Sequence, residues 1–409
     1  MSDKKTYDTR FGIEIEFCLI TPSAEREDVY ASMEGSMHAR ASLAVQLASK
    51  TDLPIAVKCE HLRHLEGMRC FNCYEAPVEV LIPNGRVYSQ RRPETETETD
   101  DATMYRYNMI QSEYLFGTKG IDKHHRRRAT EIASQIFDHD ELEAGLPKMA
   151  QIVEALRTID MPVVADEGCG LHIHVGPKSG MTLQYAQRVI SLAIMLEYHL
   201  IDKFLPPSRK ESKYSGLICN VSNVTKGKIN YIMSRVGITT HWLLNNATEP
   251  NSRSKKHFPV PLNDNIKKIE SFVHSIWRVD DWELLTCFIS EGSIVAGIAI
   301  ADREDESKKT IEFRYPQMNF LHSFMVLWAS LAVKLGDIAS LELDDFVKYS
   351  TALARALNEH AGKEDCWQHL LQALDLGHQI PEWTAQIARH DAGEAISMVD
   401  DRFFLKRPE

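Results

Sequence analysis

Gly170-Leu-His-Ile-His-Val-Gly176 is the stretch from which the fold of this chain is inferred. Its apolar and polar residues alternate, which is typical of a β-strand with one buried face. His172 and His174 then lie on the same face, about 7 Å apart. Two imidazoles at this spacing suit a centre that holds metal and phosphate. From this motif alone, a half-buried strand with two incidental histidines remains the alternative.

Two further stretches repeat this design, with apolar residues on one face and charged residues on the other. They are Phe11-Gly-Ile-Glu-Ile-Glu-Phe17 and Thr310-Ile-Glu-Phe-Arg-Tyr315. Such alternation predicts a sheet with one face covered by helices and one face open. The charged positions are Glu14 and Glu16 in the first stretch, and Glu312 and Arg314 in the second.

A weaker copy of the pattern is Val78–Ile82, where Glu79 lies between two valines. Together the four stretches would place glutamate, histidine and arginine on the open face of one sheet. Carboxylates are the ligands that hard divalent cations prefer, and a guanidinium binds phosphoryl oxygens in a fork. The pattern therefore indicates a cradle for divalent metal and phosphate.

Composition narrows the class of protein. The chain has 409 residues, 44% of them hydrophobic, which is enough for a sizeable core. The formal net charge of −11 argues against general nucleic-acid binding. The start of the sequence does not read as a signal peptide, and no apolar run suggests a membrane span. We therefore expect a cytoplasmic protein that binds no membrane, with its eight cysteines reduced.

A possible second metal site follows the first strands. Cys70 and Cys73 have the spacing of half a zinc site, and Cys59, His61 or His64 could complete it. The alternative, which we favour, is incidental cysteines beside a loop, because the other half lacks the regular spacing of zinc modules.

Helical periodicity is found in several segments. The spacing predicts helices over Glu25–Lys50, Pro147–Thr158 and Leu183–Phe204, the last with Thr182 as its N-cap. It also favours a helix over Thr130–Phe137, which makes the preceding basic run, residues 123–128, a solvated helix start.

The domain organisation is expected to be simple. Residues 1–342 would form the catalytic domain, and residues 343–409 a C-terminal helical extension. Polar stretches near 91–128 and 245–265 resemble insertions, and the second is predicted to be a long surface loop.

The three alternating motifs, taken in this order, resemble the putative amidoligase family, a branch of the carboxylate–amine ligases. The resemblance extends from Phe11 to about Ile338. It implies an α+β fold of the glutamine synthetase and glutamate–cysteine ligase type, with a curved, mainly antiparallel sheet and helices on its convex face. It also implies ATP and two or more Mg2+ ions, or Mn2+, on the concave face.

The resemblance also implies roles for individual residues. His174 would lie near ATP or substrate, and Arg314 would hold phosphate. Asp166 could help to remove a proton from the amine, although a role in shaping the turn is favoured. The implied metal ligands are Glu14, Glu16, Glu79, His172 and Glu312.

Three hypotheses remain at this point. The first is an ATP-dependent ligase that joins a carboxylate to an amine through an acyl phosphate. The second is a metal-dependent hydrolase that uses His172 and His174, and the third is an inactive binding protein on the same fold. The excess of glutamate over histidine and the nearby arginine favour the first. Its substrates would be small-molecule, peptide or protein carboxylates and amines, and assembly into a homo-oligomer is compatible with the resemblance.

Overall fold

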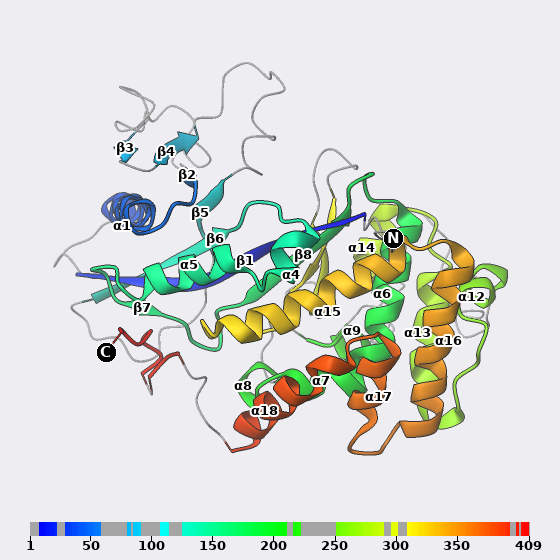
Figure 1. Ribbon diagram of the computed structural model, residues 1–409. Helices are drawn as coiled ribbons and strands as arrows, with labels where there is room; N and C mark the ends of the chain where they lie inside the picture. The colour runs from blue at the N-terminus through cyan, green and yellow to red at the C-terminus, as the bar shows by residue number, and fades with distance from the viewer. Residues whose placement is uncertain are drawn as a thin grey trace, which may run out of the picture. The chain divides into compact units, whose positions relative to one another are not determined.

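The structure is a computed structural model (Figure 1). It describes residues 8–22, 29–58, 80–82, 85–90, 107–113, 125–210, 216–221, 251–289, 296–301, 309–392, 398–400 and 402–408. Two compact units are formed from segments that alternate along the chain. The first contains Met1–Phe11, His172–Pro316 and Leu327–Glu394, and the second contains Gly12–Leu171, Gln317–Val326 and Ala395–Glu409.

The second unit is built on a mixed sheet. Its strands pair in the order β3-β4-β2-β5-β6-β1, and β7 pairs with β1. β2 is parallel to β4 and β5, whereas the other pairs are antiparallel. The strands are β1 (Thr9–Pro22), β2 (Ile55–Lys58), β3 (Val80–Ile82), β4 (Gly85–Gln90), β5 (Asn108–Ser112), β6 (His125–Ala133) and β7 (Val163–Val164).

The helices of this unit cover apolar faces of its strands. α1 (Val29–Lys50) lies against β2 in Figure 1, and it also contacts α5 (Pro147–Leu156). A short helix, α4 (His139–Glu143), precedes α5. The expected alternation of β1 is observed, because Ile13 and Ile15 are fully buried while Glu14 between them is not. The predicted helix ending at Lys50 is confirmed, and that beginning at Pro147 ends at Leu156.

The first unit contains three strands of the ten-stranded sheet, which pair antiparallel in the order β8-β10-β9. The strands are β8 (Leu171–Pro177), β9 (Ile298–Ala301) and β10 (Thr310–Phe313). The helices are α6 (Leu183–Leu196), α7 (Asp202–Phe204), α8 (Pro207–Lys210), α9 (Ile218–Val221), α12 (Ser252–His257), α13 (Lys267–Ile276), α14 (Trp282–Ile289), α15 (His322–Ser340), α16 (Leu343–His360), α17 (Cys366–Ala373) and α18 (Ile380–Asp391).

The α+β class is therefore confirmed, with mostly antiparallel strand pairing in both units. The boundary between the units falls within β1, β8 and α15. The C-terminal helices α16, α17 and α18 belong to the same unit as His172–Pro316.

The helix predicted over Leu183–Phe204 begins as expected, since the Thr182 side chain accepts a hydrogen bond from the amide of Tyr185 at 3.1 Å. It is interrupted by a π-helical turn over Glu197–Ile201. The carboxylate of Glu197 is fully buried there and accepts hydrogen bonds from the amides of Ile218 (2.5 Å) and Cys219 (2.8 Å). A tertiary anchor of this kind is not visible in helical periodicity.

Large aromatic side chains join the C-terminal helices to the rest of the first unit. Trp383 of α18 stacks on Phe204 of α7, with ring centroids 3.5 Å apart and planes inclined by 5°. Trp328 and Trp367 contact the same phenylalanine edge-on. Because buried aromatic pairs contribute both area and specific geometry, this cluster fixes residues 366–391 against the unit that carries β8 and β10.

Two segments differ from expectation. Residues 125–133, which overlap the helix predicted over Thr130–Phe137 and the basic helix start predicted over 123–128, form β6 instead, where Thr130 pairs with Phe17 of β1. Pairing with a neighbouring strand outweighs local propensity here. The predicted loop near 245–265 contains α12, capped by the Asn251 side chain, which accepts from the amide of Ser254 at 2.7 Å.

One helix among the described residues, α15, is long and apolar enough to cross a membrane by length and composition alone. This differs from the sequence-based expectation, which identified no such run. In the structure 67% of its apolar window is buried, as is usual for a core helix that passes the same test.

A substitution at Gly297, which precedes β9, tests how closely the backbone packs against Tyr315 beside the strands β8, β10 and β9. A Cβ atom added there would lie 2.0 Å from the ring of Tyr315, which is fully buried and donates a hydrogen bond to Glu197 at 2.6 Å. We therefore expect Gly297→Ala to lower the free energy of unfolding by about 1–3 kcal/mol, measured by urea denaturation. Gly176→Ala is the matched control, because its Cβ would meet its neighbours only at 3.5 Å. Equal stability of the two variants would contradict this packing.

Candidate metal and phosphate site

The second unit gathers carboxylates on neighbouring strands. Glu16 of β1 pairs with Glu131 of β6, and Gln111 of β5 pairs with Glu131 from the other side. Glu113 follows β5 directly. Carboxylate oxygens of Glu16, Glu113 and Glu131 all lie within 4.8 Å of one another. Strand register, rather than proximity in sequence, therefore brings these three acidic side chains together.

Burial makes this arrangement costly for the ionised form. Glu16 and Glu131 are 4% and 3% exposed. Burial, followed by the charges of Glu14 and Glu113, raises the pKa of Glu131 well above its ordinary value, against the hydrogen bond that Gln111 donates to it at 2.6 Å. A proton or a cation must offset the repulsion between these groups.

Glu16 is also fixed by the backbone that leads into β8. Its Oε2 accepts a hydrogen bond from the amide of Gly170 at 2.5 Å, and its own amide donates to the Gly170 carbonyl at 3.0 Å. The carboxylate of Glu16 is therefore held in one orientation before any ligand binds.

The first unit carries the second group of predicted residues, on β8 and β10. Glu312 pairs with His174 in the antiparallel register. His172 Nδ1 lies 3.1 Å from Glu312 Oε1, and His174 Nε2 lies 4.0 Å from the same oxygen. The other ring nitrogen of His174 is 2.9 Å from the hydroxyl of Thr310. The structure thus brings together the two histidines and the glutamate predicted from alternation.

Glu312 is a buried carboxylate with several positively charged or polar neighbours. Burial favours a higher pKa, but the hydrogen bond from His172 and the charges of His174 and Arg314 outweigh it. Together they lower the pKa of Glu312 to about 2. Glu312 therefore remains ionised over the whole physiological range and can serve as a permanent anionic ligand.

Arg314 completes this group. Its Nη1 lies 2.5 Å from Glu312 Oε1, and its amide donates to the carbonyl of Gly297 at 2.7 Å. Its carbonyl accepts from Arg209 Nη2 at 2.9 Å, and Arg209 Nε donates to the carbonyl of Tyr315 at 3.2 Å. Arg209, which is 1% exposed, therefore fixes the backbone at Arg314 and Tyr315.

Asp166 has a well-defined structural environment. It forms an ion pair with Arg127 of β6, and its Oδ1 accepts from the amide of Gly168 at 2.9 Å. Both contacts support the turn that leads into β8. This arrangement favours the turn-shaping role over that of a general base.

The remaining predicted ligands lie outside the described residues. These are Glu79 and the proposed zinc ligands Cys59, His61, His64, Cys70 and Cys73. Sequence reasoning missed Glu113, Glu131 and Arg209. A strand over residues 125–133 would have placed Glu131 on the face it shares with Arg127, but the segment was interpreted as a helix.

The donor sets fit the ions that the resemblance implies. Glu16, Glu113 and Glu131 offer only carboxylate oxygens, the ligands that Mg2+ prefers, and their mutual repulsion would be relieved by a cation. Glu312 with His172 and Arg314 offers a mixed acidic and cationic group suited to a metal–phosphate ligand. The two groups are therefore of the kinds that a divalent cation and an anionic ligand require.

Comparison with known families identifies the class of protein to which the chain belongs. The model of the family described as putative amidoligase enzyme matches residues 7–335. The chain belongs to this family, and the match contains every described strand of the two units. A search of curated proteins finds no match.

The raised pKa of Glu131 predicts a pH dependence of stability in metal-free buffer. A glutamate in the unfolded chain titrates near pH ~4.3, whereas folded Glu131 keeps its proton to higher pH. Its contribution to the free energy of unfolding is therefore full below pH ~4 and is lost as pH rises through the folded pKa. With a chelator present, Glu131→Gln should melt above the wild type at neutral pH, and the gap should narrow toward pH ~4.

The control for this prediction is Glu143→Gln, since Glu143 is an exposed glutamate at the end of α4 in the same unit. Thermal melting curves measured across the pH range should leave this variant parallel to the wild type. A Glu131→Gln variant that also runs parallel to the wild type would contradict the charge crowding.

Proposed function

We propose that this protein is an ATP- and Mg2+-dependent ligase that forms an amide bond between a carboxylate and an amine. Membership of the amidoligase family supports ligase activity. Two observations carry the finer proposal: the set of three carboxylates Glu16, Glu113 and Glu131, and the mixed acidic and cationic group around Glu312. A glutamine synthetase-like arrangement, with the sheet curved around the nucleotide, belongs to the same proposal.

The proposed roles follow from the chemistry of each side chain. Glu16, Glu113 and Glu131 would hold Mg2+, or Mn2+, and the ion would neutralise the charge of a bound triphosphate. Glu14 and His172, which the family resemblance adds as metal ligands, belong to the same proposal. Glu312 would add a carboxylate that stays ionised, and His172 orients it at 3.1 Å. Glu79, which the family resemblance adds to the ligands, remains part of the proposal.

Bound ATP would supply the phosphoryl group that activates the substrate carboxylate as an acyl phosphate. In such a transfer, positioning and charge stabilisation carry most of the rate enhancement. Arg314 is proposed to bind phosphoryl oxygens, with Glu312 and Arg209 setting the position of its side chain and its backbone. His174 would lie beside the nucleotide or substrate, where its imidazole can accept a proton from the attacking amine.

Substrates and partners are proposed at the level of chemical class. The acid and the amine belong to small molecules, peptides or proteins, and neither nucleic acid nor membrane is expected as a partner. The negative net charge of −11 is consistent with this. A cytoplasmic location would supply ATP and keep the cysteines reduced, and a homo-oligomer remains part of the proposal.

A metal-dependent hydrolase is the second candidate, because two histidines and a glutamate lie close together on β8 and β10. Imidazole ligands favour transition metals such as Zn2+ or Mn2+ over Mg2+. The separate set of three carboxylates, Glu16, Glu113 and Glu131, favours Mg2+ and so the ligase over the hydrolase. An inactive binding protein on the same fold is the third possibility, and the next experiment separates all three.

The test is release of ADP from ATP and Mg2+ by the purified full chain, with a panel of amino acids and peptides as carboxylates and amines. We expect turnover that depends on an added carboxylate or amine. Glu312→Gln and Arg314→Ala should each reduce it by roughly 10²–10³-fold. The first removes an anionic ligand that also positions Arg314, and the second removes the cation proposed to bind the phosphoryl oxygens.

Glu143→Gln and Arg389→Ala are the matched controls, since both residues are exposed and lie outside the two groups. They should retain the wild-type rate. Substrate hydrolysis without ATP, or metal binding with no nucleotide turnover under any condition, would overturn the ligase proposal and favour the second or third candidate.

A further inference from the structure

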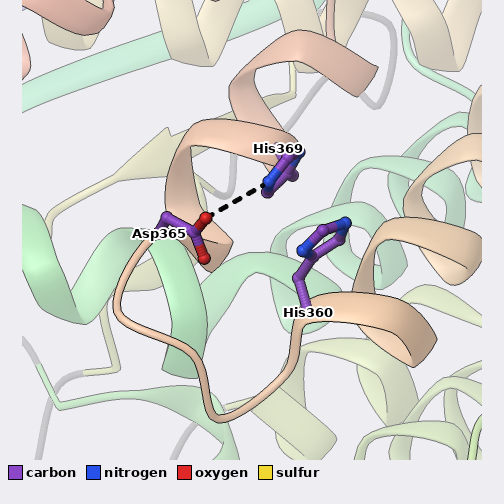
Figure 2. A group of neighbouring side chains, drawn as sticks. All are labelled: His360, Asp365 and His369. Carbon is purple, nitrogen blue, oxygen red and sulfur yellow. Dashed lines mark ion pairs between the residues drawn. The ribbon is translucent and has the colours of Figure 1, made fainter.

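A second cluster of potential metal ligands lies beyond the matched region, at the junction of α16 and α17. His360 ends α16, Asp365 immediately precedes α17, and His369 lies one turn into α17. One ligand atom from each of these residues lies within 4.8 Å of the others. Figure 2 shows the three side chains converging from the two helix ends and the loop between them. The family match ends at residue 335, so this cluster is not part of it.

The distances suit a transition metal. His369 Nε2 lies 3.5 Å from Asp365 Oδ2, the ion pair drawn in Figure 2. Ligand atoms about 2.0–2.1 Å from a tetrahedral Zn2+ are about 3.3–3.4 Å from one another. The observed separation is therefore close to that of two ligands on one zinc ion.

The two imidazoles lie next to each other at this junction, and one ring must rotate out of the stack for both in-plane lone pairs to reach a single ion. The rings of His360 and His369 stack with centroids 3.5 Å apart and planes inclined by 18°. Among the described residues, the buried Nδ1 of His360 has no hydrogen-bond partner. This nitrogen has a lone pair available to a metal in the neutral ring.

The opposite nitrogen of the same ring faces a carboxylate. His360 Nε2 lies 3.8 Å from Glu359 Oε2. Histidines that bind metals commonly donate their second N–H to such a group, which fixes the tautomer and raises the basicity of the ligating nitrogen. At 3.8 Å the two atoms are at ion-pair distance and not hydrogen-bonded, so the Glu359 carboxylate would have to move closer to Nε2 to support His360 as a ligand through Nδ1.

We propose that His360, Asp365 and His369 form a binding site for a transition-metal ion, with Zn2+ as the expected occupant. Two imidazoles and one carboxylate favour Zn2+ over Mg2+ or Ca2+, which take oxygen ligands. The side chains are 21%, 53% and 34% exposed, so the fourth position would be open to water or an external ligand. Such an ion would tie the end of α16 to the start of α17.

The test measures zinc bound to the full chain after removal of metal with a chelator and re-addition of Zn2+. Wild type should hold one equivalent more than His360→Ala and His369→Ala. His378→Ala is the matched control, because His378 is an exposed histidine in the same C-terminal region but outside the cluster. Differences between variants cancel zinc bound elsewhere on the chain.

Glu359→Gln provides a graded variant. It should keep the site but weaken zinc binding by about 10–100-fold, the effect typical of removing a carboxylate that supports a histidine ligand. Equal zinc content and affinity in the wild type and all of these variants would overturn the proposal.

A measurement on the wild-type chain avoids dependence on the folding of variants. Diethylpyrocarbonate modification, followed by peptide mass spectrometry, should show that Zn2+ protects His360 and His369 but not His378. Equal modification of all three with and without Zn2+ would also overturn the proposal. Neither result depends on ligase activity, so this site can fail while the proposed function stands.

Discussion

The repulsion between the buried carboxylates of Glu16 on β1 and Glu131 on β6, and that of Glu113 directly after β5, is the constraint on which the account depends. Glu16 and Glu131 are almost completely buried, and Glu113 brings a third carboxylate within 4.8 Å of both. An uncompensated charge in a protein interior is strongly unfavourable, so such a group must be protonated or matched by a cation. Burial and the neighbouring carboxylates together raise the pKa of Glu131. A bound divalent cation would offset the repulsion while leaving all three groups ionised.

In the group on β8 and β10, the charge of the buried carboxylate is offset by other side chains of the chain. Glu312 is as buried as the other carboxylates, but His172 and Arg314 contact it directly, and its pKa is lowered rather than raised. The group of Glu16, Glu113 and Glu131 thus requires a proton or a bound cation to offset its charge. Glu312, in contrast, is already neutralised by His172 and Arg314. A ligase that must hold both metal and phosphate needs groups of both kinds.

The sequence predicted those features that depend on local alternation. The alternating burial around Glu14 in β1, and the strands that carry His172 and Glu312, follow from period-two patterning, whereas Arg314 lies one residue beyond β10. Features set by distant pairing could not be predicted in this way. Glu131 occupies its position because β6 pairs with β1, and local propensity favoured a helix there.

Arg209 and Glu197 illustrate the same limit. Each is a charged residue that sequence alone assigns to a surface connector or to a helix, and each is buried against backbone groups contributed by distant segments. Buried polar anchors of this kind depend on tertiary contacts for their hydrogen bonds, so no local pattern identifies them. The cluster at the end of α16 was likewise invisible as a motif, because its ligands come from two helix ends and a loop.

The central claim is that the carboxylates of Glu16, Glu113 and Glu131 bind a divalent cation, and Mn2+ reports on this most directly. Electron paramagnetic resonance of the metal-free chain titrated with Mn2+ should show loss of the free-ion signal as Mn2+ binds. Glu16→Gln should restore much of that signal, whereas Glu143→Gln should not. Mn2+ that stays free in the presence of the wild-type chain, or that binds Glu16→Gln equally well, would contradict the account.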